Sequence, residues 1–314
     1  DEAKKYGIKI HAWMNPYRIS TSAKSIEEAI QNGQYLGEAL PSVNVANKAE
    51  NLIKGDTGVI LNPGLQVVRD FIVDTCMEVV ENYDVDAIHF DDYFYIKNSE
   101  DADTFEKNNP TNLSLANWRR HQVDLFIEQL HDEMTAHNEE YGKNVQLGIS
   151  PSGIYRNGSY STNTPQYDEN GNLTYPLYSN TSGFAHYDNY LYSDTKKWID
   201  EEWIDYILPQ TYWAIGHTSA SFAKLAEWWS WAVKYKKVNL YTDGACSGNP
   251  GNGGYGAILE FNGVKKELSQ GYSNTTNNRM EIMGVLACLK YFKNPEVVTI
   301  YSDSQYVVNS INKN

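Results

Sequence analysis

Two adjacent carboxylates, Asp91 and Asp92, follow residues 85–90, a stretch with four apolar residues that has the length and composition of a buried strand. Carboxylates beside apolar surface lose hydration, and one pKa of a close pair is usually raised. Such groups can serve as an acid, a base or a nucleophile. Because neighbours in a strand point to opposite faces, we expect one to face a substrate and the other to bind nearby backbone or a hydroxyl. The alternative is an ordinary strand end whose aspartates cap the next loop.

Segments of strand and helix character alternate around this pair. Parallel α/β barrels present functional side chains at the carboxyl ends of their strands, where polar residues stand here. Further strands are expected at residues 8–14, 145–150 and 204–213, and helices at 65–82, 114–141, 194–202 and 221–234. The alternation therefore predicts a parallel α/β barrel with Asp91 and Asp92 at the end where the carboxyl ends of its strands meet. Residues 20–60 are polar and irregular and give no clear assignment.

The pattern changes after residue 236. An Asn-Gly turn at 262–263 joins two strand-like runs, 255–261 and 264–272, which is typical of a hairpin. Thr276 or Asn277 is suited to cap the helix that follows. The other expected elements are strands at 238–243 and 296–303 and helices at 280–292 and 304–312. Meandering strands followed by helices indicate a separate α+β unit, so we expect domains at 1–235 and 236–314.

Composition narrows the classes of function. The 314-residue chain has a formal net charge of −14, which argues against binding nucleic acid over its whole surface. Its 24 Tyr and 8 Trp suit stacking on sugar rings, although such surfaces also bind proteins and nucleic acids. The three cysteines are far apart and predict neither a disulfide framework nor a zinc site. No apolar run approaches about 18 residues, so no membrane span is expected.

Five motifs in the first part resemble the bacterial glycosyl hydrolase-like family 10. They are residues 11–18, 62–64, 88–95, 148–151 with 156–157, and 205–207 with 209–213. The resemblance implies a TIM (β/α)8 barrel that acts on glycans, and some relatives cleave peptidoglycan strands stripped of their peptides. The family pattern places two strands before His11 and two after Trp213. We therefore expect a partial barrel.

The resemblance also implies where the glycan binds. Related barrels place the nucleophile at the end of the fourth strand, where Asp91 and Asp92 lie, and a second carboxyl group is required. Asp188 and Asp194 are weak candidates for that acid, and an equal alternative is that it lies on the strands that the family pattern places before His11 or after Trp213. Aromatic rings can stack on pyranoses, while amides and guanidinium groups can bond hydroxyls, although each such residue could equally belong to the core. The expected substrate-binding residues are His11, Trp13, Asn15, Arg18, Arg156, Asn157, Gln210, Tyr212 and Trp213.

The last part resembles the first half of ribonuclease HI, through residues 241–251, 275–281 and 301–307. Asp243, Glu281 and Asp303 match carboxylates that surround divalent cations in that family, which implies Mg²⁺ or Mn²⁺ as cofactor. The resemblance implies RNA–DNA hybrids as substrate and a partial ribonuclease H-like α+β domain. Positions that contact the minor groove of the hybrid match Asn249, Asn277 and Gln305. The family's fourth carboxylate would lie beyond Asn314, so we expect weak or no nuclease activity.

Together the two resemblances imply a chimeric hydrolase. One alternative is a carbohydrate-binding pseudoenzyme that keeps its aromatic residues but does not cleave. Another is a non-functional fusion or assembly product, joined near residues 238–241, whose sequence suits either family. The relatives of the first part work at the cell envelope and ribonuclease HI works in the cytoplasm, so the two resemblances imply different compartments.

Overall fold

The computed structural model describes residues 2–33, 45, 48–158, 166–167, 173–174, 178–179, 181–233, 239–240, 245–247, 250–261 and 264–290. The chain divides into two compact units. Unit 1 contains residues 1–156, 184–208 and 232–239, and unit 2 contains 157–183, 209–231 and 240–314. Each unit draws on several stretches of sequence, and the division at residue 235 stays a prediction.

Unit 1 is built on a parallel sheet, as predicted. Its strands are β1 (His11–Met14), β5 (Ala87–Asp91), β6 (Gln146–Ser150) and β9 (Tyr206–Ile207). They pair in that order, with β10 (Asn239–Leu240) next after β9. This sheet is the part of a TIM-type barrel that the described residues contain. The strand predicted at 204–213 was wrong in extent, because Pro209 has no N–H with which to continue the ladder.

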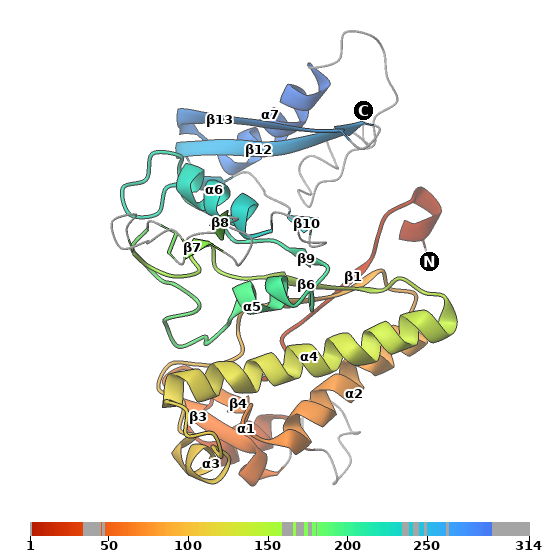
Figure 1. Cartoon of the computed structure of the whole chain (residues 1–314), viewed down its shortest axis with the longest axis vertical. Coiled ribbons are helices and arrows are strands. Elements are labelled where there is room, and N and C mark those ends of the chain that lie inside the picture. Colours follow the sequence, from red (N-terminus) through yellow and green to blue (C-terminus); the bar gives the residue numbers. More distant parts are fainter. Residues whose placement is uncertain are drawn as a thin grey trace. The chain divides into compact units, whose positions relative to one another are not determined.

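Three helices of unit 1 lie where the sequence predicted them. They are α2 (Gln66–Asn82), α4 (Leu115–Tyr141) and α5 (Thr195–Asp200). The side chain of Ser114 accepts a hydrogen bond from the Asn117 N–H at the start of α4. Gly142 ends the helix with a left-handed φ of 61°. Figure 1 shows α2 and α4 side by side in unit 1.

An aromatic core joins the sheet to these helices. The Phe90 side chain on β5 is fully buried, and its ring centroid lies 5.6 Å from that of Phe126 on α4. Phe94 follows β5 and lies edge-on to Trp198 of α5, 5.7 Å away. Burial of these rings fixes β5 against the helices, and thereby fixes the position of the carboxylates at its end.

Residues 18–61 contain elements that the sequence did not reveal. A small antiparallel sheet has the order β2 (Arg18–Ser20), β4 (Gly58–Leu61), β3 (Leu52–Gly55). The remaining helices of the described part of unit 1 are short: α1 (Ile26–Gly33), α3 (Ala102–Lys107), and the 3-10 turns η1 (Ala3–Tyr6) and η4 (Ala49–Asn51). The strands are only three or four residues long, too short to show a clear alternation of polar and apolar residues.

Unit 2 contains the predicted hairpin. Strands β11 (Ala245–Ser247), β12 (Gly251–Phe261) and β13 (Val264–Thr275) form an antiparallel sheet, followed by α7 (Asn277–Leu289). This helix begins before the predicted residue 280 because Thr276 caps it, accepting from the Arg279 N–H at 3.3 Å. Most of α6 (Phe222–Ala232) and the pair β7 (Gln166–Tyr167) and β8 (Leu173–Thr174) complete the described part. The elements predicted at 296–312 lie outside the described residues.

Candidate active site at the carboxyl ends of the strands

One face of the parallel sheet carries polar side chains, and the opposite face is core. Register places Trp13, His89, Gly148 and Tyr206 in one row across β1, β5, β6 and β9. Asp91 lies two residues beyond His89 and therefore on the same face, which we call the polar face. On the other face, Ile88, Phe90 and Ile149 are fully buried.

Asp91 ends β5 on the polar face and is half-buried. Burial raises the pKa of its carboxyl group, while a hydrogen bond from the Trp13 side chain and the charge of Arg18 oppose that rise. The Arg18 guanidinium also stacks over the ring of Tyr93, 4.5 Å from its centroid. A partly desolvated carboxyl group beside an aromatic and a cation is suited to interact with developing positive charge.

Asp92 is directed elsewhere. Its side chain is only 3% exposed, and its Oδ2 accepts a hydrogen bond from the Ser152 backbone N–H at 2.6 Å. Burial raises the pKa of Asp92 to about 6, although the Ser152 hydrogen bond lowers it and the charge of Asp91 raises it further. The carboxylate thus holds the loop that follows β6.

This contact continues into a buried chain of hydrogen bonds that we call the Asp92 network: Asp92, Ser152, His186 and Thr195. The Ser152 carbonyl oxygen lies 2.8 Å from Nδ1 of His186, and Thr195 Oγ1 lies 2.9 Å from its Nε2. Because a carbonyl can only accept, Nδ1 donates and Nε2 accepts from the threonine hydroxyl. Burial lowers the pKa of His186 to about 3, so the ring is neutral. Sequence reasoning missed His186, since a lone histidine in a loop carries no signal of such partners.

A second chain of hydrogen bonds, the His–Tyr–His network, lies on the polar face. The Tyr206 hydroxyl oxygen is 3.0 Å from Nδ1 of His89 and 2.7 Å from Nδ1 of His11. The Tyr206 and His89 rings stack, with centroids 5.7 Å apart and planes 15° apart. His11 was predicted as a site residue; His89 and Tyr206 were not. Alternation from Asp91 could have identified His89, whereas Tyr206 resembles any aromatic of a core strand.

Gly148 makes this network sterically feasible. A Cβ atom at residue 148 would lie 1.9 Å from Cζ of Tyr206, far inside van der Waals contact. The tyrosine ring therefore crosses β6 where that strand has no side chain, and it reaches His89 on β5 and His11 on β1.

The other predicted barrel residues of unit 1 lie on β1, just after it, or after β6. Trp13 is 63% exposed, and the buried Oδ1 atom of Asn15 has no hydrogen-bond partner among the described residues. Arg156 pairs with Asp188 at 3.1 Å, and Asp194 accepts from the Tyr155 hydroxyl at 2.8 Å while capping α5. Both weaker candidates for the general acid thus have structural partners.

The remaining barrel predictions fall in unit 2. Asn157 donates from Nδ2 to the Gly183 carbonyl at 2.6 Å, which indicates a role in bracing its loop. Tyr212 is exposed, and Gln210 and Trp213 are half-buried. Their convergence with the polar face stays a prediction.

One of the three predicted metal ligands is described. Glu281 lies in the first turns of α7 and is half-buried, and Asn277 is exposed at the start of that helix. The predicted ligands Asp243 and Asp303 and the predicted hybrid-binding residues Asn249 and Gln305 lie outside the described residues. Within the described ranges, no three or more His, Cys, Asp or Glu side chains are grouped so as to hold a metal ion.

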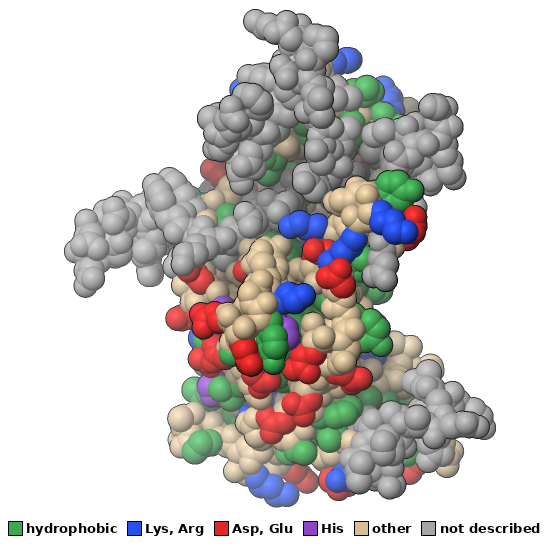
Figure 2. Space-filling model, turned by 90° about the vertical axis from the view of Figure 1, so that its right-hand side faces the viewer, with side chains coloured by type: hydrophobic (Ala, Val, Ile, Leu, Met, Phe, Trp, Pro, Cys, Tyr) green, Lys and Arg blue, Asp and Glu red, His purple; other side chains and the backbone are tan. Residues whose placement is uncertain are grey.

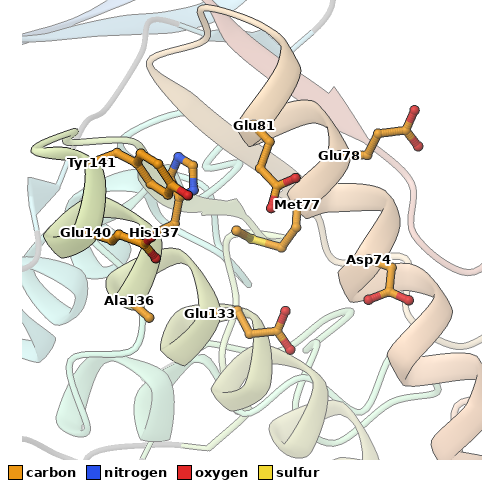
Figure 3. A pocket seen from close by; sticks show the side chains of 9 residues that line it. All are labelled: Asp74, Met77, Glu78, Glu81, Glu133, Ala136, His137, Glu140 and Tyr141. Atoms are coloured by element: carbon orange, nitrogen blue, oxygen red, sulfur yellow. The ribbon is translucent and has the colours of Figure 1, made fainter.

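A groove of about 500 Å³ lies between α2 and α4 (Figure 3). The His137 ring packs on Tyr141 with centroids 4.7 Å apart. None of the predicted site residues lines this groove, so it is separate from the polar face. The lining residues are Asp74, Met77, Glu78, Glu81, Glu133, Ala136, His137, Glu140 and Tyr141.

The described surface is acidic, and no described helix combines the length and hydropathy needed to cross a membrane. On the face shown in Figure 2, acidic side chains lie across much of the described surface, in keeping with the formal net charge of −14.

Two family profiles match the sequence. Glycosyl hydrolase-like 10 matches residues 1–248, and RNase H matches residues 235–314. The matches overlap at 235–248, which includes the stretch that suited both families. The first part of the chain is thus a glycosyl hydrolase-like domain, and it is fused to a ribonuclease H segment.

Individual proteins agree with the two profiles. Glycosyl hydrolase DigH of Escherichia coli (strain K12) is 35% identical over 247 residues, 77% of this chain and 51% of that protein. Ribonuclease H of Chlorobium phaeobacteroides (strain BS1) is 63% identical over 79 residues, 25% of this chain and 53% of that protein. The chain therefore spans about half the length of these curated relatives.

Among solved structures, the spore cortex-lytic enzyme SleL of Bacillus megaterium QM B1551 matches with a TM-score of 0.36 and 13% identity. The match covers 91% of this chain and 44% of SleL. A score this low supports no statement about function.

Proposed function

The chain belongs to the glycosyl hydrolase-like 10 family, and we propose that unit 1 cleaves a glycosidic bond of a bacterial glycan with Asp91 as nucleophile or charge-stabilising carboxylate. The position of Asp91 carries the proposal. It is half-buried at the end of β5, on the same face as Trp13 and His89. Asp92, by contrast, is occupied by the Ser152 N–H.

The surroundings of Asp91 suit a sugar. The transition state of glycoside hydrolysis resembles an oxocarbenium ion, which a nearby carboxylate stabilises. The exposed Trp13 ring offers a flat face for a pyranose, and Oδ1 of Asn15 can accept from a hydroxyl or an acetamido N–H. Peptidoglycan strands without peptides are the substrate that we propose, since they present bare sugar rings along their length.

The test is release of new reducing ends from such strands by the wild-type chain, Asp91→Asn and Asp92→Asn. Asp91→Asn should slow hydrolysis by about 10²–10⁴-fold, the usual contribution of a positioned catalytic carboxyl group. Asp92→Asn should keep most activity, because an amide oxygen can still accept from the Ser152 N–H. Full activity of Asp91→Asn would exclude this role for Asp91.

A second candidate, binding without cleavage, is favoured by the contacts of the other carboxylates. Asp188 is paired with Arg156, and Asp194 accepts from Tyr155 and caps α5, so neither is readily available as the general acid. Retention of glycan strands with no hydrolysis, unchanged in Asp91→Ala and Asp92→Ala, would support the binding protein over the enzyme.

For residues 235–314 we propose hydrolysis of the RNA strand of RNA–DNA hybrids. Asp243, Glu281 and Asp303 would hold Mg²⁺ or Mn²⁺, because carboxylate oxygens are the ligands that such hard cations prefer. A bound divalent cation supplies stabilisation of negative charge at the phosphate. Asn249, Asn277 and Gln305 would contact the minor groove, where hydroxyl groups distinguish RNA from DNA.

A labelled hybrid, incubated with the full chain and either ion, tests this activity. We expect weak or no cleavage, and any cleavage should disappear with a chelator and in Glu281→Gln, which keeps the size of the side chain but removes its charge. Cleavage that Glu281→Gln leaves unchanged would assign it to a contaminating nuclease or to another site.

A further inference from the structure

We propose that Tyr206 is a positioning residue: its hydroxyl fixes the imidazoles of His11 and His89 so that at least one Nε2 atom accepts a hydrogen bond from a sugar hydroxyl. The proposal rests on the glycan-binding function proposed for unit 1. To the Trp13 ring, the Asn15 Oδ1 atom and the Asp91 carboxyl group it adds an imidazole nitrogen that accepts a hydrogen bond.

The number of hydrogens on the Tyr206 oxygen determines the tautomers. Nδ1 of both histidines lies within hydrogen-bond distance of that oxygen, at 3.0 and 2.7 Å. A hydroxyl has one hydrogen and can donate it to at most one of the two. The other Nδ1 must then carry its own hydrogen and donate to the oxygen. In a neutral imidazole, that leaves Nε2 as an acceptor.

Both imidazoles are neutral at ordinary pH. Burial lowers the pKa of His89 to about 4, and the neighbouring His11 adds to the effect. Partial desolvation of the ring also lowers the pKa of His11, against the opposing charge of Asp86. Both rings are therefore neutral at pH 7, as the assignment of their tautomers requires.

The Nε2 atoms are open to a ligand. His11 is exposed and His89 is half-buried. In the part of the chain that the structure describes, neither Nε2 has a hydrogen-bond partner, whereas both ring nitrogens of His186 do. A polar atom that the fold positions but does not bond is suited to recognise a ligand.

The neighbouring groups indicate what that ligand is. Trp13 pairs with His89 in the sheet register, and Asp91 shares their face. An exposed aromatic ring, a carboxyl group and a lone-pair acceptor together complement a pyranose, which has a flat apolar face and outward hydroxyls. A fully deprotonated phosphate would be disfavoured, because it has no hydrogen to donate to Nε2 or to an ionised Asp91.

Nitrogen NMR of the full chain labelled with ¹⁵N-histidine tests the tautomers directly. His11→Gln and His89→Gln assign the two rings among the seven histidines of the chain. We expect at least one ring protonated on Nδ1 in the wild type. Finding both rings protonated on Nε2 alone would overturn the proposal without reference to any activity.

Binding of peptide-free glycan strands tests the recognition step, measured in the Asp91→Asn background so that the ligand is not consumed. Tyr206→Phe keeps the ring over Gly148 but removes the hydroxyl, and we expect roughly tenfold weaker binding, as for loss of about one hydrogen bond. Tyr83→Phe is the matched control, since Tyr83 is an exposed tyrosine at the end of α2 and away from the polar face. His11→Gln, at an exposed residue, gives an independent loss of binding should Tyr206→Phe fold poorly.

The outcomes separate this proposal from the proposed function. If glycan strands bind Tyr206→Phe and His11→Gln as tightly as they bind the Asp91→Asn chain, the His–Tyr–His network has no part in recognition. That result overturns the inference alone. If glycan strands bind neither the Asp91→Asn chain nor its variants, that result overturns the proposed function and the inference with it. Weaker binding in both variants, with the Tyr83→Phe control unchanged, supports the role of Tyr206.

Discussion

The Asp92 network and the His–Tyr–His network flank the end of the same strand and differ in one respect. Both contain neutral histidines held by hydroxyl or backbone groups. In the Asp92 network both ring nitrogens of His186 are bonded and the side chain is 0% exposed. In the His–Tyr–His network Nδ1 of each ring is bonded, whereas Nε2 has no hydrogen-bond partner among the residues that the structure describes. Polar groups whose bonds are complete stabilise the fold, whereas groups held at one end only are positioned for a ligand.

His186→Ala should have the largest effect on stability, because it breaks the Asp92 network. The Ser152 carbonyl and the Thr195 hydroxyl would lose a partner inside the protein, and a cavity would form. We expect a loss of about 3 kcal/mol or more in the free energy of unfolding. Denaturant unfolding followed by tryptophan fluorescence measures it. His186→Asn, whose amide can still donate to the Ser152 carbonyl, should recover part of the loss, and equal losses in both would argue against the hydrogen bond.

Asp92→Asn should change how stability depends on pH. The pKa of Asp92 is about 6 in the folded chain and near 3.8 when unfolded. Between these values the unfolded chain has released a proton that the folded chain still holds, so wild-type stability falls as pH rises through this window. The variant lacks this fall. Relative to the wild type it should gain up to about 3 kcal/mol between pH 4 and 7. Parallel curves of unfolding free energy against pH would show that Asp92 is not the group responsible.

Gly148→Ala should disrupt the His–Tyr–His network by displacing the ring of Tyr206. The new Cβ, 1.9 Å from Cζ, would force the ring away from His89 and His11. We expect a loss of about 1–3 kcal/mol, typical of overpacking, together with altered histidine nitrogen shifts. Thermal unfolding and NMR measure the two effects. Gly216→Ala is the control, since no atom of the described residues lies within 4 Å of a Cβ there. Unchanged nitrogen shifts in Gly148→Ala would contradict the arrangement.

Trp13→Ala should have the smallest effect on stability, because the ring is 63% exposed. We expect a change within about 0.5 kcal/mol. Affinity for peptide-free glycan strands should nevertheless fall clearly, since a stacking face is lost. Calorimetric titration beside thermal unfolding gives both numbers. A large loss of stability with unchanged affinity would place Trp13 among the structural residues.

Local patterns in the sequence predicted the framework of this site. Alternation within residues 85–92 indicated that Asp91 and Asp92 would differ in direction, and helical periodicity located α2 and α4. Local patterns could not show which of the two carboxylates faces the substrate, because that depends on where the Ser152 N–H lies. Tyr206 and His11 are 195 residues apart, and only the folded sheet brings them together. Side-chain hydrogen bonds between distant strands leave no trace in local composition.

The missing side chain at residue 148 also links two positions in evolution. As long as residue 206 is a tyrosine, β6 can accept only glycine there without displacing the ring. Conversely, a lineage that loses Tyr206 is released from that restriction and can refill the space from β6. Residues 148 and 206 should therefore substitute together among relatives, and the histidines on β1 and β5 should drift once the pair has changed.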